Sequence, residues 1–459
     1  RFSGTDSASG SRSVGCCEMS FIEVQIDRIV GPTHHFGGLG VGNVASQMHA
    51  GQASNPRAAA LQGLDKMRLI AGLSVPQLIL PPQPRPDFGL LNALGFTGSP
   101  AEILQSVLNH DPMILSAAGS CSAMWTANAA TVTPSCDTDG DLPVMTVANL
   151  NASLHRSIEA ANTQSEMRSL FRDGIDVRAA LPGGVPMRDE GAANHMRLSG
   201  PDGQPGLNVF VHGDGSPEPL RHWPRQTLAT GQAIARSHGI RKNVVFHLKQ
   251  HPKAIDAGAF HNDVVAMSHH DLMIHHELAF ASECGEEIER LQRQFENVVQ
   301  SPLRILSISS EELTLEDAIK TYFFNSQIVT TSQSGKTTWT ILCPIQVQQH
   351  PVANELVQRL CAEQVFHAVH FVDLGQSMDG GGGPACLRLR VPLSEEELRS
   401  LVDAAFWTEN LDSELRGVIS ERYPSELKLA DLGDLATCQH ALETQEVLAK
   451  CLGHAAENV

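Results

Sequence analysis

The chain has 459 residues, of which 42% are hydrophobic and 18% are charged, so it can bury one large core or several smaller ones. Lys and Arg number 33 against 51 Asp and Glu, and the resulting net charge of −18 argues against nucleic acid or an anionic membrane surface as partners. No apolar run approaches the about 20 residues that span a bilayer, and none resembles a signal peptide. We therefore expect a soluble, cytoplasmic protein.

The first 20 residues differ in composition from the rest of the chain. They are rich in Ser and Gly, lack periodicity, and end at Met19 and Ser20, which resemble a natural start. We expect residues 1–20 to be a disordered leader or tag. An organellar import signal is the less favoured alternative, because the segment is short and not clearly amphipathic. No linker follows, so residues 21–459 are predicted to form a single domain.

Short apolar runs alternate with helical patterns from residue 21 onward. The runs predict strands at 21–30, 75–80, 144–150, 207–211, 243–247, 263–267, 303–309, 338–343, 369–374 and 386–391. Helices are predicted at 55–71, 225–237, 277–299, 394–405 and 440–452, and also after Ser99 and Thr314, which resemble helix caps. This interleaving predicts an α/β protein in which a strand, helix and strand unit recurs about five times.

Several familiar motifs fail on inspection. The ten cysteines contain no Cys-x-x-Cys pair, which favours free thiols in a reducing compartment. Residues 335–338 resemble the end of a phosphate-binding loop, but Thr330 stands where the first glycine is required, so we predict a turn. The paired histidines lack metal-ligand spacing, and we predict that they are surface or packed residues. No metal and no cofactor is expected.

Three segments carry residues suited to catalysis. Cys386 starts an apolar strand directly after four glycines and a proline, a position that can present a thiol to a ligand. His261 and Asp263 are two residues apart, so both would point to one face if a strand begins there. Glu190 and Asn194 lie in a loop of small residues. Taken singly, these are also what a buried cysteine, a turn and a solvated carboxylate look like.

Further polar residues occur in a glycine-rich loop at 31–46 and at His155, Arg156 and Arg225. Together with the three segments above, they supply a nucleophile, an acid/base, carboxylates and fixed cations. The combination predicts an enzyme rather than a structural protein.

Nine motifs occur in an order that resembles one family. They are THHxxGLxxGN, NPRxAAxQGLxKM, MWxANAAT, TVANLN followed by HRS, DEGAANHxRL, PRQT, FHNDV, YxFNSQ and GGGPACLRLRV. Over about residues 21–452 the chain is similar to the N-succinylarginine dihydrolases of the guanidine-modifying pentein superfamily. The resemblance implies a pentein fold, a five-bladed pseudo-symmetric α/β propeller in a single catalytic domain.

The same resemblance implies a reaction and a set of roles. N-succinylarginine would be hydrolysed twice at its guanidinium to N-succinylornithine, carbon dioxide and two ammonia, without a cofactor. Cys386 matches the nucleophile, His261 the general acid/base and Glu190 the third catalytic residue, while Asp263 would pair with the guanidinium. The positions that match substrate-binding residues are Gly37, Gly38, Leu39, Gly40, Val41, Gly42, Asn43, Val44, Ala45, Ser46, Asn128, His155, Arg156, Arg225 and Gly380.

The chain also departs from the family pattern. Gly380 replaces an asparagine before the GGGPAC run, and Gly40, Val44 and Met196 replace polar residues. Two alternative functions therefore stay open: a deiminase that stops after one hydrolysis of a related guanidine, and a non-catalytic guanidine-binding protein. A homodimer is compatible with the sequence.

Overall fold

The computed structural model describes residues 20–216, 220–281, 285–399, 401 and 405–453. Apart from Ser20, the predicted leader or tag lies outside these residues. The described strands form five sheets of three strands each. They are β15 (Arg388–Ser394), β1 (Phe21–Arg28) and β2 (Gln77–Leu80); β3 (Ala130–Thr133), β4 (Val144–Val147) and β5 (Asp176–Arg178); β6 (His195–Ser199), β7 (Gly206–His212) and β8 (Val245–Lys249); β9 (Ala266–His269), β10 (Leu272–His276) and β11 (Arg304–Ile308); β12 (Gln327–Gln333), β13 (Lys336–Pro344) and β14 (Ala368–Val372).

All five sheets have the same internal plan. The middle strand pairs antiparallel with one neighbour and parallel with the other. A parallel pair needs a crossover, and in each sheet a helix supplies it. These helices are α2 (Pro56–Gly72), α7 (Ala160–Phe171), α8 (Leu228–Ser237), α10 (Gly285–Val299) and α13 (Pro351–Ala362). The expected fivefold recurrence of an α/β unit is therefore confirmed.

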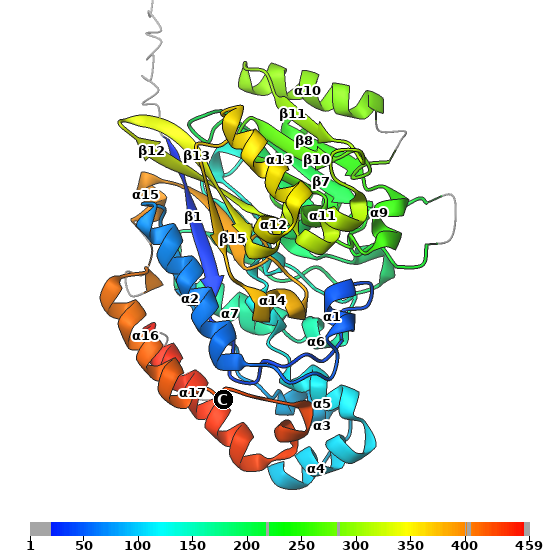
Figure 1. Cartoon of the computed structure of the whole chain (residues 1–459), viewed down its shortest axis with the longest axis vertical. Helices are drawn as coiled ribbons and strands as arrows, with labels where there is room; N and C mark the ends of the chain where they lie inside the picture. Colours follow the sequence, from blue (N-terminus) through cyan, green and yellow to red (C-terminus); the bar gives the residue numbers. More distant parts are fainter. Residues whose placement is uncertain (1–19, 217–219, 282–284, 400, 402–404, 454–459) are drawn as a thin grey trace, which may run out of the picture.

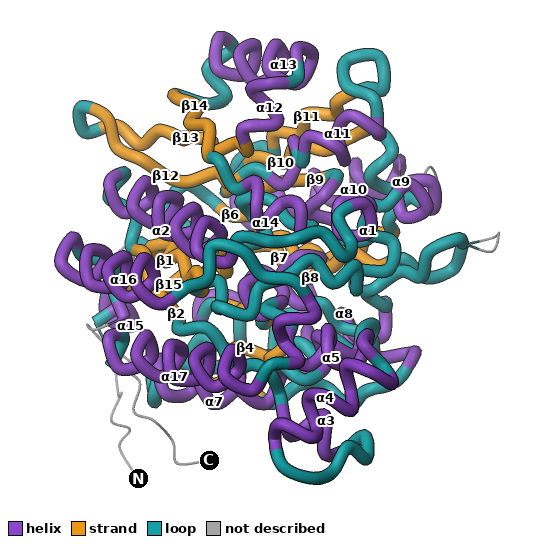
Figure 2. The backbone as a smooth tube through the Cα atoms, turned by 60° about the horizontal axis from the view of Figure 1, so that its bottom comes forward, coloured by secondary structure: helices purple, strands orange, loops and turns teal. Residues whose placement is uncertain are grey.

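The two ends of the chain meet in the first sheet. Strand β15, near the C-terminal end, pairs with β1 in antiparallel register from Phe21 opposite Ser394 to Asp27 opposite Arg388. Figure 1 shows these strands, blue and orange, side by side. The pairing closes the ring of sheets, while α13 and α17 (Leu435–Cys451) lie at the periphery in Figure 2.

The remaining helices are mostly short. They are α1 (Val44–Met48), α3 (Phe88–Ala93), α4 (Pro100–His110), α5 (Pro112–Gly119), α6 (Leu154–Ser157), α9 (Pro252–Ala257), α11 (Leu315–Thr321), α12 (Ile345–Gln349), α14 (Gly375–Gly380), α15 (Glu395–Leu398) and α16 (Glu409–Arg422). The caps predicted at Ser99 and Thr314 are confirmed, because each side chain accepts the expected backbone N–H bond. None of the described helices is long and apolar enough to cross a membrane.

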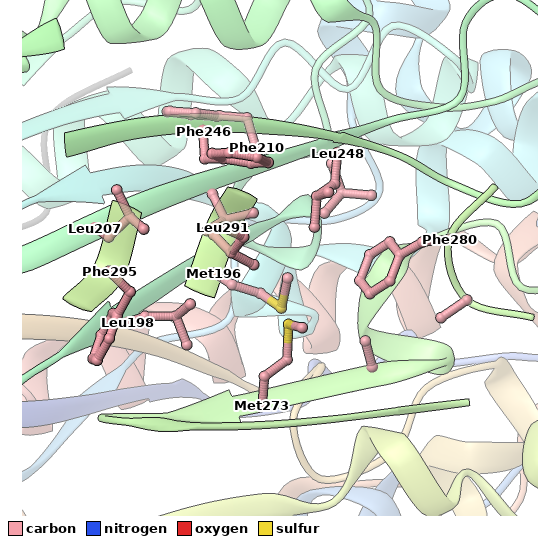
Figure 3. Packing of buried hydrophobic residues seen from close by; sticks show 14 of the residues in the cluster. Met196, Leu198, Leu207, Phe210, Phe246, Leu248, Met273, Phe280, Leu291 and Phe295 are labelled. Carbon is pink, nitrogen blue, oxygen red and sulfur yellow. The ribbon is translucent and has the colours of Figure 1, made fainter. Parts of the chain in front are cut away.

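Apolar side chains fill the spaces between each sheet and its helix. In the sheet of β6, β7 and β8, residues Met196 and Phe210 belong to one apolar cluster with Leu291 and Phe295 of α10, the crossover helix of the neighbouring sheet (Figure 3). Met196, one of the departures from the family pattern, is only 4% exposed and is a core residue. Its apolar character is explained by this packing.

Most predicted strands are present, but some boundaries and elements are wrong. Strands β3, β5, β6, β10 and β12 were not predicted, because they are short or carry polar and histidine residues that break the apolar pattern. The helix predicted at 277–299 is seen only from Gly285, and residues 277–281 form a turn and an isolated bridge. The helix predicted at 394–405 ends at Leu398, and the one predicted at 440–452 begins at Leu435.

Two predictions about motifs were tested by the fold. The turn between β12 and β13 is formed by residues 334–335, so of the turn predicted at 335–338 only Gly335 is confirmed, and 336–338 belong to β13. The histidines at 269, 275 and 276 are packed within β9 and β10, so the packed alternative is confirmed for them. The strand predicted at 263–267 begins only at Ala266, and 262–264 form a 3-10 turn. The idea that His261 and Asp263 share a strand face was therefore wrong.

Candidate active site

Each sheet contributes one inner strand to the centre of the ring, and a short turn precedes each of these strands. The turns are η2 (Thr126–Asn128) before β3, η5 (Gly191–Asn194) before β6, η7 (Asn262–Val264) before β9, η9 (Phe323–Asn325) before β12, and residues 384–387 before β15. Neighbouring turns pack against one another. Nearly all of the residues singled out for catalysis lie in or directly beside these turns.

Asparagine side chains join the first three turns. Asn128 Nδ2 donates a hydrogen bond to the Glu190 carbonyl at 2.8 Å, which ties η2 to η5. Asn194 Oδ1 accepts the Asn262 backbone N–H at 2.9 Å, which ties η5 to η7. An amide side chain suits this task because it can both donate and accept. Asn128, predicted to bind substrate, thus also has a structural bond.

The last two turns complete the ring around Cys386. Asn325 Nδ2 donates to the Asp263 carbonyl at 3.3 Å and to Cys386 Sγ at 3.2 Å, while Asn325 Oδ1 accepts the Cys386 N–H at 3.2 Å. The Cys386 carbonyl accepts the Ala127 N–H at 3.1 Å, which returns to η2. A closed cycle of hydrogen bonds therefore holds the five turns in one arrangement.

The Cys386 thiol lies in an environment that keeps its proton. Its Sγ is 3.5 Å from Asp263 Oδ2, and the residue is only 5% exposed. Burial and the nearby Asp263 charge raise the pKa of Cys386 well above its ordinary value, against the opposing effect of the Asn325 hydrogen bond. Burial also raises the pKa of Asp263 to about 7. The structure thus places an uncharged thiol beside a carboxyl group that titrates near neutrality.

His261 is held by a hydrogen bond to Glu190, which forms a buried ion pair with Arg156. Its Nε2 lies 3.1 Å from Glu190 Oε2, and the same oxygen accepts a hydrogen bond from Arg156 Nη1 at 2.6 Å. Burial alone would raise the pKa of Glu190, but the Arg156 charge and the His261 hydrogen bond hold it far below its ordinary value. Burial lowers the pKa of His261 to about 4 despite Glu190. At neutral pH the imidazole is uncharged and able to accept a proton.

A polar cavity, called the front cavity, opens in front of these groups. Its lining includes Cys386, His261, Asn128, His155, Arg156 and Arg225. Glu190 and Asp263 are not part of the lining, so Glu190 contacts the cavity only through His261 and Arg156. The sequence analysis had treated all of these residues as members of one site. In the structure most of them line the front cavity, whereas Glu190 and Asp263 lie behind it, in contact with His261 and Cys386.

Two arginines provide positive charge in the front cavity. Arg225 stacks on the Phe260 ring at 4.4 Å and donates from Nη2 to the Val41 carbonyl at 2.7 Å. Arg156 has two guanidinium nitrogens, Nε and Nη2, without a partner among the described residues. Burial lowers the pKa of His155 to about 3, so this histidine is neutral beside them. The pair is suited to a ligand that carries carboxylates.

The glycine-rich loop lies along one side of the front cavity. Of the loop positions predicted to bind substrate, the lining contains Gly37, Gly38, Leu39, Gly40, Asn43 and Ser46, and lacks Val41, Gly42, Val44 and Ala45. Asn43 Nδ2 donates to the Gly381 carbonyl at 2.7 Å and so attaches the loop to the glycine run before Cys386. Gly380 also lines the cavity.

Several lining residues were missed by sequence reasoning. His34, Trp125 and Phe260 line the front cavity, and Asn325 contacts the thiol, yet none was assigned a role. Asn325, like Asn128 and Cys386, stands two positions before an inner strand. With the starts of the strands known, this spacing would have identified Asn325 as a residue of the site. Among the described residues, no group of three metal-ligating side chains is present.

Comparison with known proteins gives a consistent result. A family model described as succinylarginine dihydrolase matches residues 20–456. An N-succinylarginine dihydrolase of Myxococcus xanthus is 42% identical over 440 residues, which cover 94% of this chain and 97% of the relative. That of Nitrosospira multiformis is 40% identical over 446 residues, covering 95% and 98% respectively.

Solved structures show the fold alone. The N-terminal domain of ArgZ, described as an arginine dihydrolase from cyanobacteria, aligns with a TM-score of 0.50 at 14% identity, covering 80% of this chain and 97% of that one. AgrE bound to ornithine and NAD+ aligns with a TM-score of 0.50 at 16% identity, covering 80% of this chain and 39% of that one. The five-bladed pentein architecture is thereby confirmed.

Proposed function

The chain belongs to the succinylarginine dihydrolase family, and we propose that it hydrolyses N-succinylarginine to N-succinylornithine, carbon dioxide and two ammonia in arginine catabolism. The observation that carries the mechanism is that Cys386 and His261 line one cavity together with two buried arginines, while Asp263 lies directly behind the sulfur, its Oδ2 3.5 Å from Sγ. Cys386 is the nucleophile, His261 the general acid/base, and Glu190 acts through His261.

The first hydrolysis begins when the substrate guanidinium pairs with Asp263. Its positive charge lowers the pKa of the neighbouring Cys386 thiol, so the nucleophile forms only when substrate is present. The sulfur bonds to the guanidinium carbon, and the thiol proton reaches the departing nitrogen through His261. Ammonia leaves as the carbon–nitrogen bond breaks. A water activated by His261 then breaks the carbon–sulfur bond and leaves a ureido group.

The second hydrolysis repeats these steps at the same carbon. Cys386 attacks the ureido carbon, the second ammonia leaves, and water releases a carbamate from the sulfur. Loss of carbon dioxide from the carbamate gives the free amine of N-succinylornithine. In total, two waters enter and two ammonia molecules leave, which balances the reaction.

Arg156 and Arg225 would bind the carboxylates at the other end of the substrate. Both line the front cavity, and the unpartnered nitrogens of Arg156 are available for a bidentate contact. Because Arg156 also contacts Glu190, substrate binding and the orientation of His261 share one residue.

One experiment separates this proposal from the two alternatives. The purified protein is incubated with N-succinylarginine, and ammonia is counted against N-succinylornithine and N-succinylcitrulline by mass detection. Two ammonia per N-succinylornithine supports the dihydrolase. One ammonia with N-succinylcitrulline as end product supports a deiminase, and binding without turnover supports a guanidine-binding protein.

The cytoplasmic location and the homodimer stay predictions. The free state of Cys121, Cys136, Cys343, Cys361, Cys386, Cys438 and Cys451 supports a reducing compartment. The oligomeric state is open to measurement by light scattering.

A further inference from the structure

A second cavity lies on the other side of the ring of turns. This back cavity is lined by residues of inner strands from all five sheets, including Val132 of β3, Arg197 of β6, Ser268 of β9, Ile328 of β12 and Arg390 of β15. No described residue lines both the front and the back cavity. The back cavity is therefore a separate space centred on the same axis.

The wall between the two cavities is thin. Adjacent residues of the chain face opposite sides of it: Asn262 lines the back cavity and His261 the front, while Ala385 lines the back and Cys386 the front. Asp263 lines the back cavity, yet its Oδ2 is 3.5 Å from Cys386 Sγ. A single layer of side chains thus separates the back cavity from the nucleophile.

Polar atoms in the back cavity lack partners. Arg388 Nε, Ser268 Oγ and Asn262 Oδ1 are buried, line this cavity and have no hydrogen-bond partner among the described residues. Buried polar atoms are rarely left unpaired, and a cavity with several of them is one that water fills. The back cavity therefore has the chemistry of a water site directly behind the reacting thiol.

The proposed reaction releases two ammonia molecules and consumes two waters at one carbon beside Cys386. The back cavity lies directly behind that sulfur, on the side away from the front cavity. We propose, on the basis of the proposed function, that the back cavity delivers water to the reacting carbon and accepts neutral ammonia from it. Three arginines, Arg197, Arg388 and Arg390, line the back cavity against two carboxyl groups, Glu23 and Asp263, and this excess of positive charge disfavours ammonium over neutral ammonia.

Blocking the back cavity tests this route. Ser268 lines the back cavity, is 5% exposed and has an unpartnered hydroxyl. Ser268→Met therefore places a larger side chain in the cavity, whereas Ser268→Ala places a smaller one there. We expect Ser268→Met to lower kcat about fivefold or more, with KM little changed and a larger share of N-succinylcitrulline among the products. Ser268→Ala should match the wild type. Val132→Phe, which adds bulk from another sheet, should behave as Ser268→Met does.

A trapping experiment on the unaltered protein gives an independent test. Labelled N-succinylarginine is turned over in the presence of excess unlabelled N-succinylcitrulline, and the label in free N-succinylcitrulline is measured. We expect almost none, because the intermediate stays bound between the two hydrolyses. Release of much of the label as free N-succinylcitrulline would overturn the proposal. Folded Ser268→Met and Val132→Phe variants with the wild-type kcat and product ratio would overturn it as well. Failure of the wild type to hydrolyse N-succinylarginine would instead overturn the proposed function.

Discussion

Asn325 donates a hydrogen bond to the sulfur of Cys386 and accepts another from the backbone N–H of the same residue. The two residues lie 61 positions apart in the chain, in the turns before β12 and β15. One side chain thus determines where the thiol lies and lowers the energy of its charged form.

Removal of this contact should impair catalysis more than binding. A hydrogen bond to a charged group contributes about 1.5–3 kcal/mol, so Asn325→Ala should lower kcat by about ten- to a hundredfold with a smaller change in KM. The Asn325 hydrogen bond lowers the pKa of Cys386, so its loss should raise that pKa. Because the thiol supplies the proton that reaches the departing nitrogen, the fall in rate at high pH should then occur at a higher pH. A pH series of kcat/KM measures this.

A matched control is Asn354→Ala, a partly exposed asparagine in α13 whose side chain accepts a hydrogen bond from Gln358 of the same helix. It should leave both kcat and the pH profile unchanged. An Asn325→Ala variant with wild-type kinetics would show that the bond to sulfur has no part in the reaction.

Cys386→Ser should abolish turnover and keep substrate binding. An alcohol has a much higher pKa than a thiol and cannot attack the resonance-stabilised guanidinium carbon, while the arginines and Asp263 are unaltered. N-succinylarginine should still raise the thermal midpoint of the variant. Retention of more than a few per cent of the wild-type rate would remove Cys386 from the nucleophile role.

Asp263→Asn should make the protein more stable at pH about 8 and less active. Burial raises the pKa of Asp263 from 3.8 to about 7, so the folded state binds this proton more tightly than the unfolded state. Stability from this group is present below the unfolded pKa and is lost as pH rises toward 7. An amide resembles the protonated form, so the variant should have a higher thermal midpoint at pH about 8, and the gain should shrink at pH about 4.

The same variant should lose the ion pair with the guanidinium. We expect kcat/KM to fall by about ten- to a hundredfold. If Asp263→Asn were less stable than the wild type at pH about 8, the ionised Asp263 carboxylate would not be destabilised by burial as proposed.

Gly380→Asn should improve substrate binding. Gly380 does not have a positive φ, and an added Cβ would lie 3.5 Å from Trp125 and 3.6 Å from His34, which are ordinary contacts. The asparagine that the family has here can therefore be restored without strain. One recovered hydrogen bond should lower KM about two- to tenfold with kcat little changed.

The control for this substitution is the next residue. Gly381 has a φ of +117°, and a Cβ there would overlap the Asn43 side chain. Gly381→Asn should therefore disrupt the loop and reduce kcat strongly. If Gly380→Asn also reduced kcat strongly, the loop would require glycine at both positions, and the proposed recovery of a hydrogen bond to substrate would be wrong.

The sequence by itself determined the features that depend on neighbours within a few residues. Helix caps at Ser99 and Thr314 were predictable because the capping atoms lie three residues from their partners. The motifs around Cys386, His261 and Glu190 carried enough similarity to indicate the family and the five-bladed fold. Their chemical types also predicted a nucleophile, a base and a carboxylate.

Only the tertiary structure decided how these residues act together. The ring of turns depends on contacts such as Asn128 with Glu190, 62 positions apart, and Asn325 with Cys386, which no local pattern encodes. The turn at 262–264 places Asp263 beside the thiol and His261 against Glu190, where a strand had been expected. Burial, which sets the direction of the pKa shifts of Cys386, Asp263 and His261, arises when the five sheets close, because desolvation depends on what all of them exclude. For Glu190 the charge of Arg156, 34 positions away in the chain, together with the His261 hydrogen bond outweighs burial.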